Sequence, residues 1–389
     1  MPYQHFADQL AHLKQQGNFR QFRTSQQYGR YIEIAQQQML NLSSNDYLGI
    51  AADASLVEQF LAQLPNSMKR MSASSSRLLT GHFDIYNQLE HNLSQSFAGR
   101  AALLFNSGYH MNIGILPALA DRHSLILADK LVHASMIDGI RLSSAQYLRY
   151  RHNDMQHLAE LLAKYQDDAR YTRIIVVTES IFSMDGDEAD LVALVALKQQ
   201  YSKVMLYVDE AHAVAVRGAT GLGCAEQAGV IEQIDFLLGA FGKALASVGG
   251  YLICHDIIKD YLINHMRPLI FSTALAPINI AWSNFVWQHM QSLQSSRQHL
   301  AQLSDQLHQA LQQAGYPCPS TSHIVPMIIG ESHAALTRAK QLQQAGFYLM
   351  AVRPPTVPQH SARLRICLNS LIRQGDLELL LQALLGDSL

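Results

Sequence analysis

Short apolar runs that alternate with helix-like stretches constrain the fold of this chain more than any other feature. Between residues 101 and 254 these runs are apolar at consecutive positions, not at alternate ones. They are Ala101–Phe105, Ser124–Ala128, Arg173–Thr178, Val204–Val208, Asp235–Gly239 and Gly250–Cys254. Strands of this kind are buried on both faces, which is typical of a mostly parallel sheet covered by helices. The pattern therefore predicts an α/β fold.

The regions on either side of these runs have a different pattern. Residues 1–20 have a helical pattern with Phe6, Leu10 and Leu13 on one face, whereas the region after Pro277 is helical to about Gln313 and then mixes strands with helices. A chain of 389 residues is long enough for two domains. We therefore expect an N-terminal helix and arm over residues 1–45, a large α/β domain over 46–280 and a small C-terminal α+β domain over 281–389.

Composition excludes several classes of protein. The 29 basic and 31 acidic residues give a net charge of −2, which lacks the basic footprint of a nucleic-acid binder. No apolar run approaches the roughly 18 residues of a membrane span. The cysteines Cys224, Cys254, Cys318 and Cys367 are far apart, which disfavours a disulfide framework and a Cys-rich zinc site. The N-terminus does not have the pattern of a signal peptide, so we expect a cytoplasmic protein.

The segment Asp209-Glu-Ala-His212 follows the apolar run Val204–Val208. Asp209 is the first polar residue after that run, so it is expected at the carboxyl end of a strand, where a ligand could meet both Asp209 and His212. A strand-end carboxylate that only caps a helix is the alternative interpretation. The letters DEAH also occur in nucleotide-driven helicases, but those need an upstream phosphate loop ending in Gly-Lys-Ser/Thr. Here Gly242-Lys243 lies downstream and is followed by Ala244.

Lys243 lies in the Gly-rich segment GAFGKALASVGG, just after an apolar run. Lysine is among the residues least often buried. A lysine on a turn after a buried strand is therefore a candidate for Schiff-base chemistry, since a desolvated, cationic site would lower the pKa of its amine. The alternative is a solvated lysine at the start of a helix.

Other polar or small residues follow the remaining runs. The turn Ser107-Gly108-Tyr109 opens a probable helix and could seat a phosphate on free N–H groups. His133 and Ser183 each follow an apolar run by a few residues. Each could be an ordinary turn or loop residue, but one parallel sheet would bring all of them to the same edge as Asp209 and Lys243.

Arginines cluster near the C-terminus. Arg353 precedes a proline-stiffened segment, PPTVP, and the alternation in RLRICL puts Arg363 and Arg365 on the same face of a strand. Such arginines suit bidentate capture of a carboxylate. Two solvent-facing arginines on an edge strand are the alternative.

Taken together, these motifs resemble a known family. A lysine in a Gly-rich turn, an Asp-x-x-His at the preceding strand end and an upstream phosphate turn resemble fold-type I pyridoxal-phosphate enzymes. NDYLG near residue 45, HASMIDG at 133–139 and TESIFSMDGD at 178–187 narrow the resemblance to the α-oxoamine synthases. The segment RPPTVP…ARLR is most similar to members that join L-alanine to a pimeloyl thioester in biotin biosynthesis.

The resemblance implies roles for the candidate residues and a homodimer with sites at its interface. Lys243 would hold pyridoxal 5'-phosphate covalently and move the α-proton of the amino acid. Asp209 would pair with the pyridine nitrogen, His212 would hydrogen-bond the ring hydroxyl, and His133 would stack on the ring. Ser183 would lie near the polar edge of the ring. The phosphate ligands would be Gly108 and Tyr109 with Ser272 of the partner subunit. The implied substrate contacts are Arg365 and Asn45 for alanine, with His133 also beside the substrate. For the acyl group, carried by coenzyme A or an acyl carrier protein, they are Arg353, Thr356 and Arg20, with nearby Arg23 as the alternative to Arg20.

One position departs from the family pattern, and several activities stay open. The family usually has a threonine three residues before the lysine, with its hydroxyl on the phosphate, and this chain has Ala240. The alternatives within the family are aminoketobutyrate ligase, 5-aminolevulinate synthase and serine palmitoyltransferase. From other classes, the alternatives are a pyridoxal-phosphate protein without this catalysis and a nucleotide-driven motor.

Overall fold

The computed structural model describes residues 1–386, and the chain divides into two compact units. Unit 1 combines Met1–Asp53, the short segment Ser183–Asp187 and the chain from Ser295 onward, whereas unit 2 comprises Ala54–Phe182 and Glu188–Gln294. This division differs from the predicted boundaries at residues 45 and 280. The reason is long-range pairing: strand β3 (Gln37–Asn41) pairs in parallel with strand β12 (Phe347–Tyr348), so the N-terminal segment belongs with the C-terminal region.

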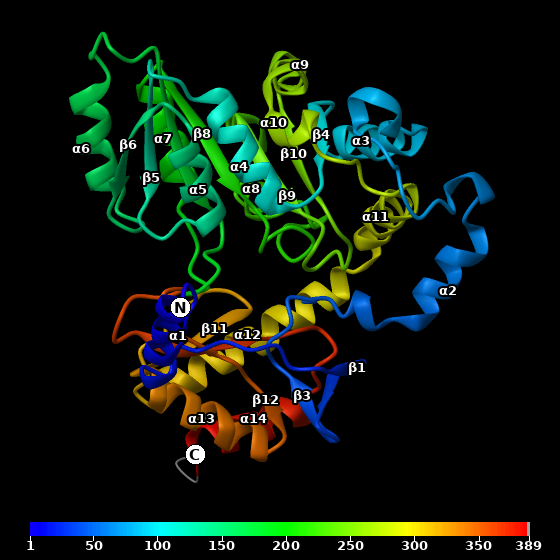
Figure 1. The fold of residues 1–389 in the computed structure, drawn as a ribbon, viewed down its shortest axis with the longest axis vertical. Coiled ribbons are helices and arrows are strands. Elements are labelled where there is room, and N and C mark those ends of the chain that lie inside the picture. Colours follow the sequence, from blue (N-terminus) through cyan, green and yellow to red (C-terminus); the bar gives the residue numbers. More distant parts are fainter. Residues whose placement is uncertain (387–389) are drawn as a thin grey trace. The chain divides into compact units, whose positions relative to one another are not determined.

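Unit 2 is built on a seven-stranded sheet in the order β4-β10-β9-β8-β7-β5-β6 (Figure 1). Its strands are β4 (Ala101–Phe105), β5 (Ser124–Asp129), β6 (Gln146–Tyr150), β7 (Arg173–Glu179), β8 (Val204–Asp209), β9 (Phe236–Ala240) and β10 (Gly250–Cys254). Strand β10 is antiparallel to both of its neighbours, and the other described pairs are parallel. The prediction of a mostly parallel sheet is therefore confirmed.

Helices cover both faces of this sheet because its strands are apolar at successive positions. One face packs in a single core with α4 (Gly108–Leu119), α5 (Ala134–Leu142), α9 (Asp256–His265) and α10 (Arg267–Ile270) (Figure 1). In addition, α3 (Asp84–Ser96) contacts β4, α6 (Met155–Tyr165) contacts β6 and α7 (Leu191–Gln200) contacts β8. The remaining helices of unit 2 are α2 (Ala54–Gln63), α8 (Cys224–Gln227) and α11 (Pro277–His289).

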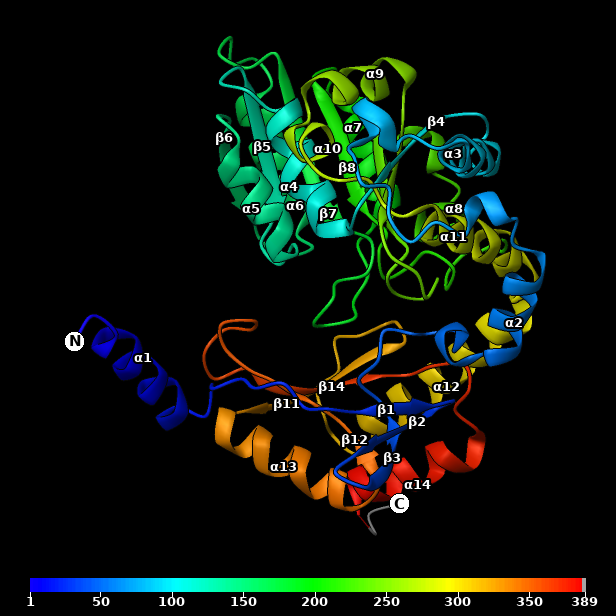
Figure 2. The same cartoon turned by 45° about the vertical axis from the view of Figure 1, so that its right-hand side comes forward.

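Unit 1 contains two small sheets, ordered β1-β2-β3-β12 and β11-β14-β13 (Figure 2). Besides β3 and β12, their strands are β1 (Gln26–Tyr28), β2 (Tyr31–Ile34), β11 (Ile324–Gly330), β13 (Ala351–Val352) and β14 (Ala362–Cys367). The helices of this region are α1 (Gln4–Gln15), α12 (Gln294–Gln313), α13 (Ser332–Gln344) and α14 (Gln374–Leu385). Helix α13 contacts strands of both sheets. Ile32, Met39 and Tyr348 form a small buried cluster across β2, β3 and β12.

Three segments differ from the sequence-based expectations. The long helix predicted after Pro277 is interrupted at 290–293, between α11 and α12. The sequence predicts one strand near Tyr348–Val352, whereas the structure has two short strands there, β12 and β13, which pair with different partners, β3 and β14. Strand β6 was not predicted, because its sequence QYLRY is polar at several positions and the strand lies at the edge of the sheet. For the two strand segments, tertiary pairing decided the outcome. Across residues 1–386, no helix has both the length and the apolar character that crossing a bilayer requires.

Candidate active site

The predicted site residues of unit 2 follow strands that end at one edge of its sheet. Strands β5, β7, β8 and β9 are parallel, and β4 runs in the same direction because β10 is antiparallel to both β4 and β9. Gly108 and Tyr109 follow β4, His133 follows β5, and Lys243 follows β9. Asp209 is the last residue of β8. The carboxyl edge of a parallel sheet is the place where ligands gather in such folds.

The first turn of α4 offers a seat for an anion. Ser107 is the N-cap residue, and its hydroxyl accepts a hydrogen bond from the His110 amide at 3.1 Å. The first N–H groups of a helix have no acceptor within it, so those of Gly108 and Tyr109 point toward the helix end. Ala240 lies beside this turn, because a Cβ on Gly108 would be 3.7 Å from the Cβ of Ala240, in ordinary contact.

Asp209 is buried and oriented by neighbours that sequence reasoning missed. Its Oδ2 accepts a hydrogen bond from Asn112 Nδ2 at 3.0 Å, and its Oδ1 accepts one from the Ala211 amide at 2.9 Å. Asn112 is itself fixed, because its Oδ1 accepts a hydrogen bond from the Tyr207 hydroxyl at 2.6 Å. The only signal in the sequence was a buried polar residue within the apolar face of α4. This network leaves Asp209 in a defined orientation at the strand end.

The same network extends to His133, the N-cap residue of α5. Asn112 Nδ2 also donates to Ser135 Oγ at 3.0 Å, and that hydroxyl lies 2.8 Å from His133 Nδ1. Loss of hydration lowers the pKa of His133, Asp209 opposes this effect, and Lys243 adds to it. A neutral imidazole at neutral pH is therefore favoured. His133 and Asp209 are thus coupled through Asn112 and Ser135.

Glu179 is a second buried carboxyl group at this edge, and the sequence analysis did not select it. It ends β7 and pairs in register with Asp209 on β8. Its Oε1 has no hydrogen-bond partner, although the residue is only 3% exposed. Burial, and then the charge of Asp209, raises the pKa of Glu179 to about 8, while Lys243 opposes the shift. The group therefore retains its proton at neutral pH.

Lys243 lies in the turn after β9 and is half-buried. The turn is closed by a hydrogen bond from the Ala246 amide to the Lys243 carbonyl at 2.8 Å. The ammonium group of Lys243 affects the pKa of both Glu179 and His133, which places its charge within electrostatic range of the same strand ends. His212 is buried three residues after Asp209. The predicted lysine and the predicted acid are therefore grouped in one unit.

A carboxylate does cap a helix here, but it is Glu210 and not Asp209. Glu210 accepts hydrogen bonds from the amides of Cys224 at 3.0 Å and Ala225 at 2.7 Å, at the start of α8, and from the Ser180 hydroxyl at 2.6 Å. A Cβ on Gly223 would lie 2.5 Å from Glu210 Oε2, so a glycine is needed at this close approach. The helix-capping role that the sequence left open for Asp209 therefore belongs to Glu210.

Arg365 and Asn45 meet within unit 1, on the central strand of its second sheet. Arg365 Nη1 donates to Asn45 Oδ1 at 3.1 Å, and Arg365 Nε donates to the Ser183 carbonyl at 2.6 Å. The Tyr47 hydroxyl also donates to Asn45 Oδ1, at 3.0 Å. These partners are all neutral, so the guanidinium retains a positive charge that a substrate carboxylate can neutralise.

The interpretation of Arg363 and Arg365 as solvent-facing residues on an edge strand is wrong. Strand β14 is central in its sheet, between β11 and β13, and Arg363 is buried. Arg363 forms an ion pair with Asp185, so its charge is already compensated. The two arginines thus differ in what they can bind, although they lie only two positions apart on the same strand.

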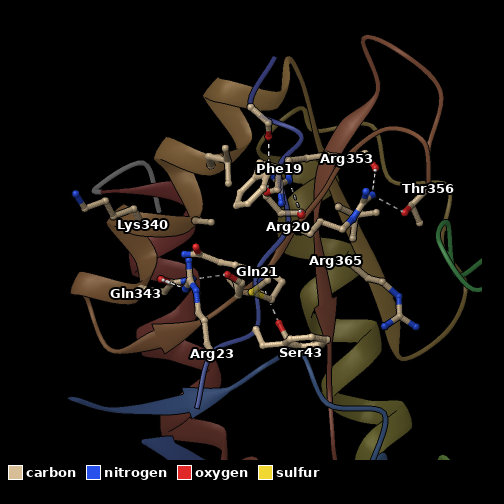
Figure 3. Close-up of a pocket in the computed structure, with 18 of the residues that line it drawn as sticks. Phe19, Arg20, Gln21, Arg23, Ser43, Lys340, Gln343, Arg353, Thr356 and Arg365 are labelled. Carbon is tan, nitrogen blue, oxygen red and sulfur yellow. Dashed lines mark hydrogen bonds between the residues drawn. The ribbon is translucent and has the colours of Figure 1, made fainter. Parts of the chain in front are cut away.

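Arg20, Arg353 and Thr356 come together in unit 1, in a cavity of about 1030 Å³ (Figure 3). The Arg20 guanidinium donates to Thr356 Oγ1 at 3.1 Å and to the carbonyl of Arg353 at 3.4 Å. Arg23 lines the same cavity and donates to Gln343 Oε1 at 3.4 Å. The contact with Thr356 favours Arg20 over Arg23 as the acyl-group residue.

Two further predicted cofactor residues, Ser183 and Ser272, make no hydrogen bond to Asp209 or Asn112 among the described residues. Ser183 belongs to unit 1, where its carbonyl accepts the Arg365 bond. Ser272 lies in unit 2 and lines a small cavity together with Asn106 and His110, close to the start of α4. Their predicted contacts with the cofactor, and the contribution of Ser272 from a partner subunit, stay predictions.

Comparison with known proteins places the chain in a family. A family model described as aminotransferase class I and II matches residues 37–384. A protein of Pasteurella multocida named putative 8-amino-7-oxononanoate synthase is 54% identical over 375 residues, which are 96% of each chain. One of Haemophilus ducreyi named 8-amino-7-oxononanoate synthase is 52% identical over 387 residues, covering 98% of this chain and all of the relative. The chain belongs to the 8-amino-7-oxononanoate synthase family.

Solved structures support the same fold class. A serine palmitoyltransferase of Sphingomonas wittichii matches with a TM-score of 0.87 and 28% identity, covering 97% of this chain and 94% of that one. An 8-amino-7-oxononanoate synthase of Francisella tularensis matches with a TM-score of 0.73 and 25% identity, covering 89% and 96%. The predicted fold-type I architecture and the predicted family are therefore confirmed, as is the cofactor, pyridoxal 5'-phosphate.

The residues at the sheet edge of this 8-amino-7-oxononanoate synthase family member fit that cofactor. A lysine, a hydrogen-bonded aspartate and a helix N-terminus match its aldehyde, its ring nitrogen and its phosphate. The small residues Gly108 and Ala240 leave room at the helix end. Glu179 Oε1 is buried without a hydrogen-bond partner in the protein, so this edge of the sheet has a polar atom that the protein leaves unsatisfied.

Proposed function

We infer that the chain catalyses the decarboxylative condensation of L-alanine with a pimeloyl thioester. The products are 8-amino-7-oxononanoate, carbon dioxide and the free thiol, so the chain is an acyltransferase of biotin biosynthesis. The observation that carries this inference is the 54% identity to a relative of that name across 96% of both chains, together with the grouping of Lys243, Asp209 and His133 in one unit. The glycine-using ligase alternative has no comparable support.

The residues of unit 2 divide the work on the cofactor side. When bound, pyridoxal phosphate supplies an aldehyde that captures amines and a ring that accepts the electron pair released at the substrate Cα. Lys243 would hold the aldehyde carbon and would serve as the group that moves the proton at Cα. Asp209, fixed by Asn112, would be the partner of the ring nitrogen. His133 would be the stacking residue, and His212 would be the hydrogen-bond partner of the ring hydroxyl.

The residues of unit 1 bind the substrates. Arg365 and Asn45 take the carboxylate of L-alanine, because Arg365 has neutral partners and a free charge to neutralise. Arg20, Arg353 and Thr356 take the acyl chain of the thioester in the unit 1 cavity. We further propose that the protein works as a homodimer in the cytoplasm, with Ser272 of each subunit reaching the phosphate of the other.

A turnover assay tests the function. Purified holoenzyme is given L-alanine, glycine or L-serine against pimeloyl, acetyl, succinyl or palmitoyl thioesters, and the free thiol is measured. We expect thiol release only with alanine and the pimeloyl thioester, and 8-amino-7-oxononanoate by mass spectrometry. Preference for glycine and an acetyl thioester would identify a ligase instead, and no thiol release with any pair would indicate a cofactor-binding protein without this catalysis.

A further inference from the structure

The unit 1 cavity is rich in positive charge beyond the needs of one acyl chain. Its cationic lining residues are Lys14, Arg20, Arg23, Lys340, Arg353 and Arg365. Figure 3 labels the last five of these. Among the described residues that line it, none has a carboxylate side chain. The full chain has slightly more acidic than basic residues, so this concentration of six cations does not follow from its composition.

These charges are not neutralised by the protein. Within residues 1–386, none of the six forms an ion pair with a carboxylate. Burial, and then repulsion from Arg20 and Arg23, lowers the pKa of Arg353. Like charges gathered without counterions destabilise a structure. The arrangement is therefore suited to an anionic ligand.

The six cations fall into two groups by their hydrogen bonds. Arg20 and Arg353 are tied to backbone carbonyls and to Thr356, and Arg365 is tied to Asn45. Those three belong to the substrate contacts proposed above. The second group, Lys14, Arg23 and Lys340, has few partners.

The second group is only loosely held by the protein. Lys14 lies 4.9 Å above the ring of Phe19, Arg23 makes one long bond to Gln343, and Lys340 makes no hydrogen bond within the described residues. All three side chains are exposed. They line the same cavity as Arg20, Arg353 and Thr356, and within residues 1–386 they form no hydrogen bond with those three residues.

We propose that Lys14, Arg23 and Lys340 form a phosphate-binding site for the thiol carrier of the acyl substrate. This site rests on the proposed function, because a pimeloyl thioester reaches the enzyme on a phosphopantetheine arm. The arm has one phosphate when it is attached to a carrier protein, and coenzyme A adds further phosphates on its nucleotide. Lysine and arginine are the side chains that bind phosphate most effectively.

The rest of the cavity matches the other parts of such an arm. Leu336, Ala339, Leu349 and Met350 give the cavity apolar walls, while Gln21, Ser43 and Gln343 offer amide and hydroxyl groups. A cavity of about 1030 Å³ is at the upper end of the range that small-molecule sites occupy. It therefore has room for more than a seven-carbon acyl chain.

Equilibrium binding to the holoenzyme tests the proposal without turnover. Calorimetric titrations at low ionic strength use coenzyme A, 4'-phosphopantetheine, pantetheine and a phosphopantetheine-bearing carrier protein. We compare wild type with Lys14→Gln, Arg23→Gln and Lys340→Gln, and with Lys164→Gln on α6 of unit 2 as the matched control. Each cavity variant should weaken binding of the phosphate-bearing ligands about three- to ten-fold, because each removes one charge-assisted contact. Binding of pantetheine, and all binding by the control, should be unchanged.

The arms of the titration also identify the source of the phosphate. A loss shared by coenzyme A, phosphopantetheine and the carrier protein assigns the site to the common phosphate, and a loss confined to coenzyme A assigns it to the nucleotide phosphates. If all three variants bind every phosphate-bearing ligand as tightly as wild type does, the proposal is wrong. Since no turnover is measured, failure of the pimeloyl assay would count against the function and leave this result standing.

Discussion

Glu179 and Asp209 end neighbouring parallel strands as a register pair, and only Asp209 has hydrogen-bond donors on both carboxylate oxygens. Glu179 Oε1 has none. Two buried carboxylates this close cannot both ionise cheaply, so the proton stays on the one with fewer donors. The pKa of Glu179 is accordingly raised, to about 8, by its burial and by the neighbouring Asp209.

The first prediction concerns the pH dependence of stability at Glu179. Its pKa is about 8 in the folded protein and near the ordinary 4.5 when unfolded. Between these values the folded state binds a proton that the unfolded state lacks, so stability falls as pH rises through this window. Glu179→Gln removes that penalty. We expect the stability of the variant relative to wild type to be greatest at pH 8, by a few kcal/mol, and the difference to shrink to about 1 kcal/mol at pH 5.

Chemical denaturation at pH 5 and pH 8 measures this difference. Glu232→Gln is the control, because Glu232 is an exposed glutamate of the same unit. A Glu179→Gln variant that loses stability equally at both pH values would show that Glu179 is ionised in the folded protein.

The second prediction concerns Lys243. Lys243→Ala should retain the fold but lose both turnover and the visible absorbance of covalently held pyridoxal phosphate, because an alanine side chain has no amine to form the covalent link. Absorbance spectra and thiol release are the measurements, with Lys164→Ala as a control for the loss of one lysine. Normal turnover by Lys243→Ala would mean that the lysine is wrongly assigned.

The third prediction concerns the charge of Asp209. Asp209→Asn keeps the shape of the side chain and can still bond to Asn112, so the fold should be intact. Without the negative charge the ring nitrogen loses its proton, and kcat should fall by roughly 100-fold or more. Steady-state kinetics with L-alanine and a pimeloyl thioester measure this. Wild-type rates in the variant would refute the electrostatic role.

The fourth prediction addresses Ala240, where related enzymes have threonine. Ala240 is buried beside Gly108 at the start of α4. Ala240→Thr would place a hydroxyl near the proposed phosphate seat and should tighten cofactor binding about ten-fold, as one added charge-assisted hydrogen bond does. Fluorescence titration of the apoprotein measures the affinity. Ala240→Val is the matched control, because it adds the same bulk without the hydroxyl, and equal effects of both would exclude the hydrogen bond.

The fifth prediction concerns the guanidinium fork of Arg365. Arg365→Lys retains the charge but loses the planar fork that bonds Asn45 and Ser183. The KM for L-alanine should rise by about ten-fold or more, while the KM for the thioester changes little. A KM for alanine equal to that of wild type would place the amino-acid carboxylate elsewhere.

Much of the site was predictable because its residues follow buried strands in the chain. Asp209, Lys243, His133 and Gly108 could be selected from the sequence, since each comes directly or a few residues after an apolar run. Glu179 also directly follows such a run, Arg173–Thr178, so the same reasoning could have found it. Asn112 could not be selected in this way, because it lies inside a helix and only the tertiary structure shows that it lies beside Asp209.

The sequence by itself determined the parallel sheet and the order of residues along its edge, because consecutive apolar positions and the residue after each run are local properties. Tertiary structure decided which charges are compensated. Arg363 forms an ion pair with Asp185, whereas Arg365 donates to the neutral carbonyl of Ser183, although the two arginines lie two positions apart on the same strand. The N-terminal segment joins the C-terminal region through β3 and β12, and so brings Lys14, Arg20 and Arg23 to the cavity of Lys340. Such pairings join residues over 300 positions apart, and no local pattern encodes them.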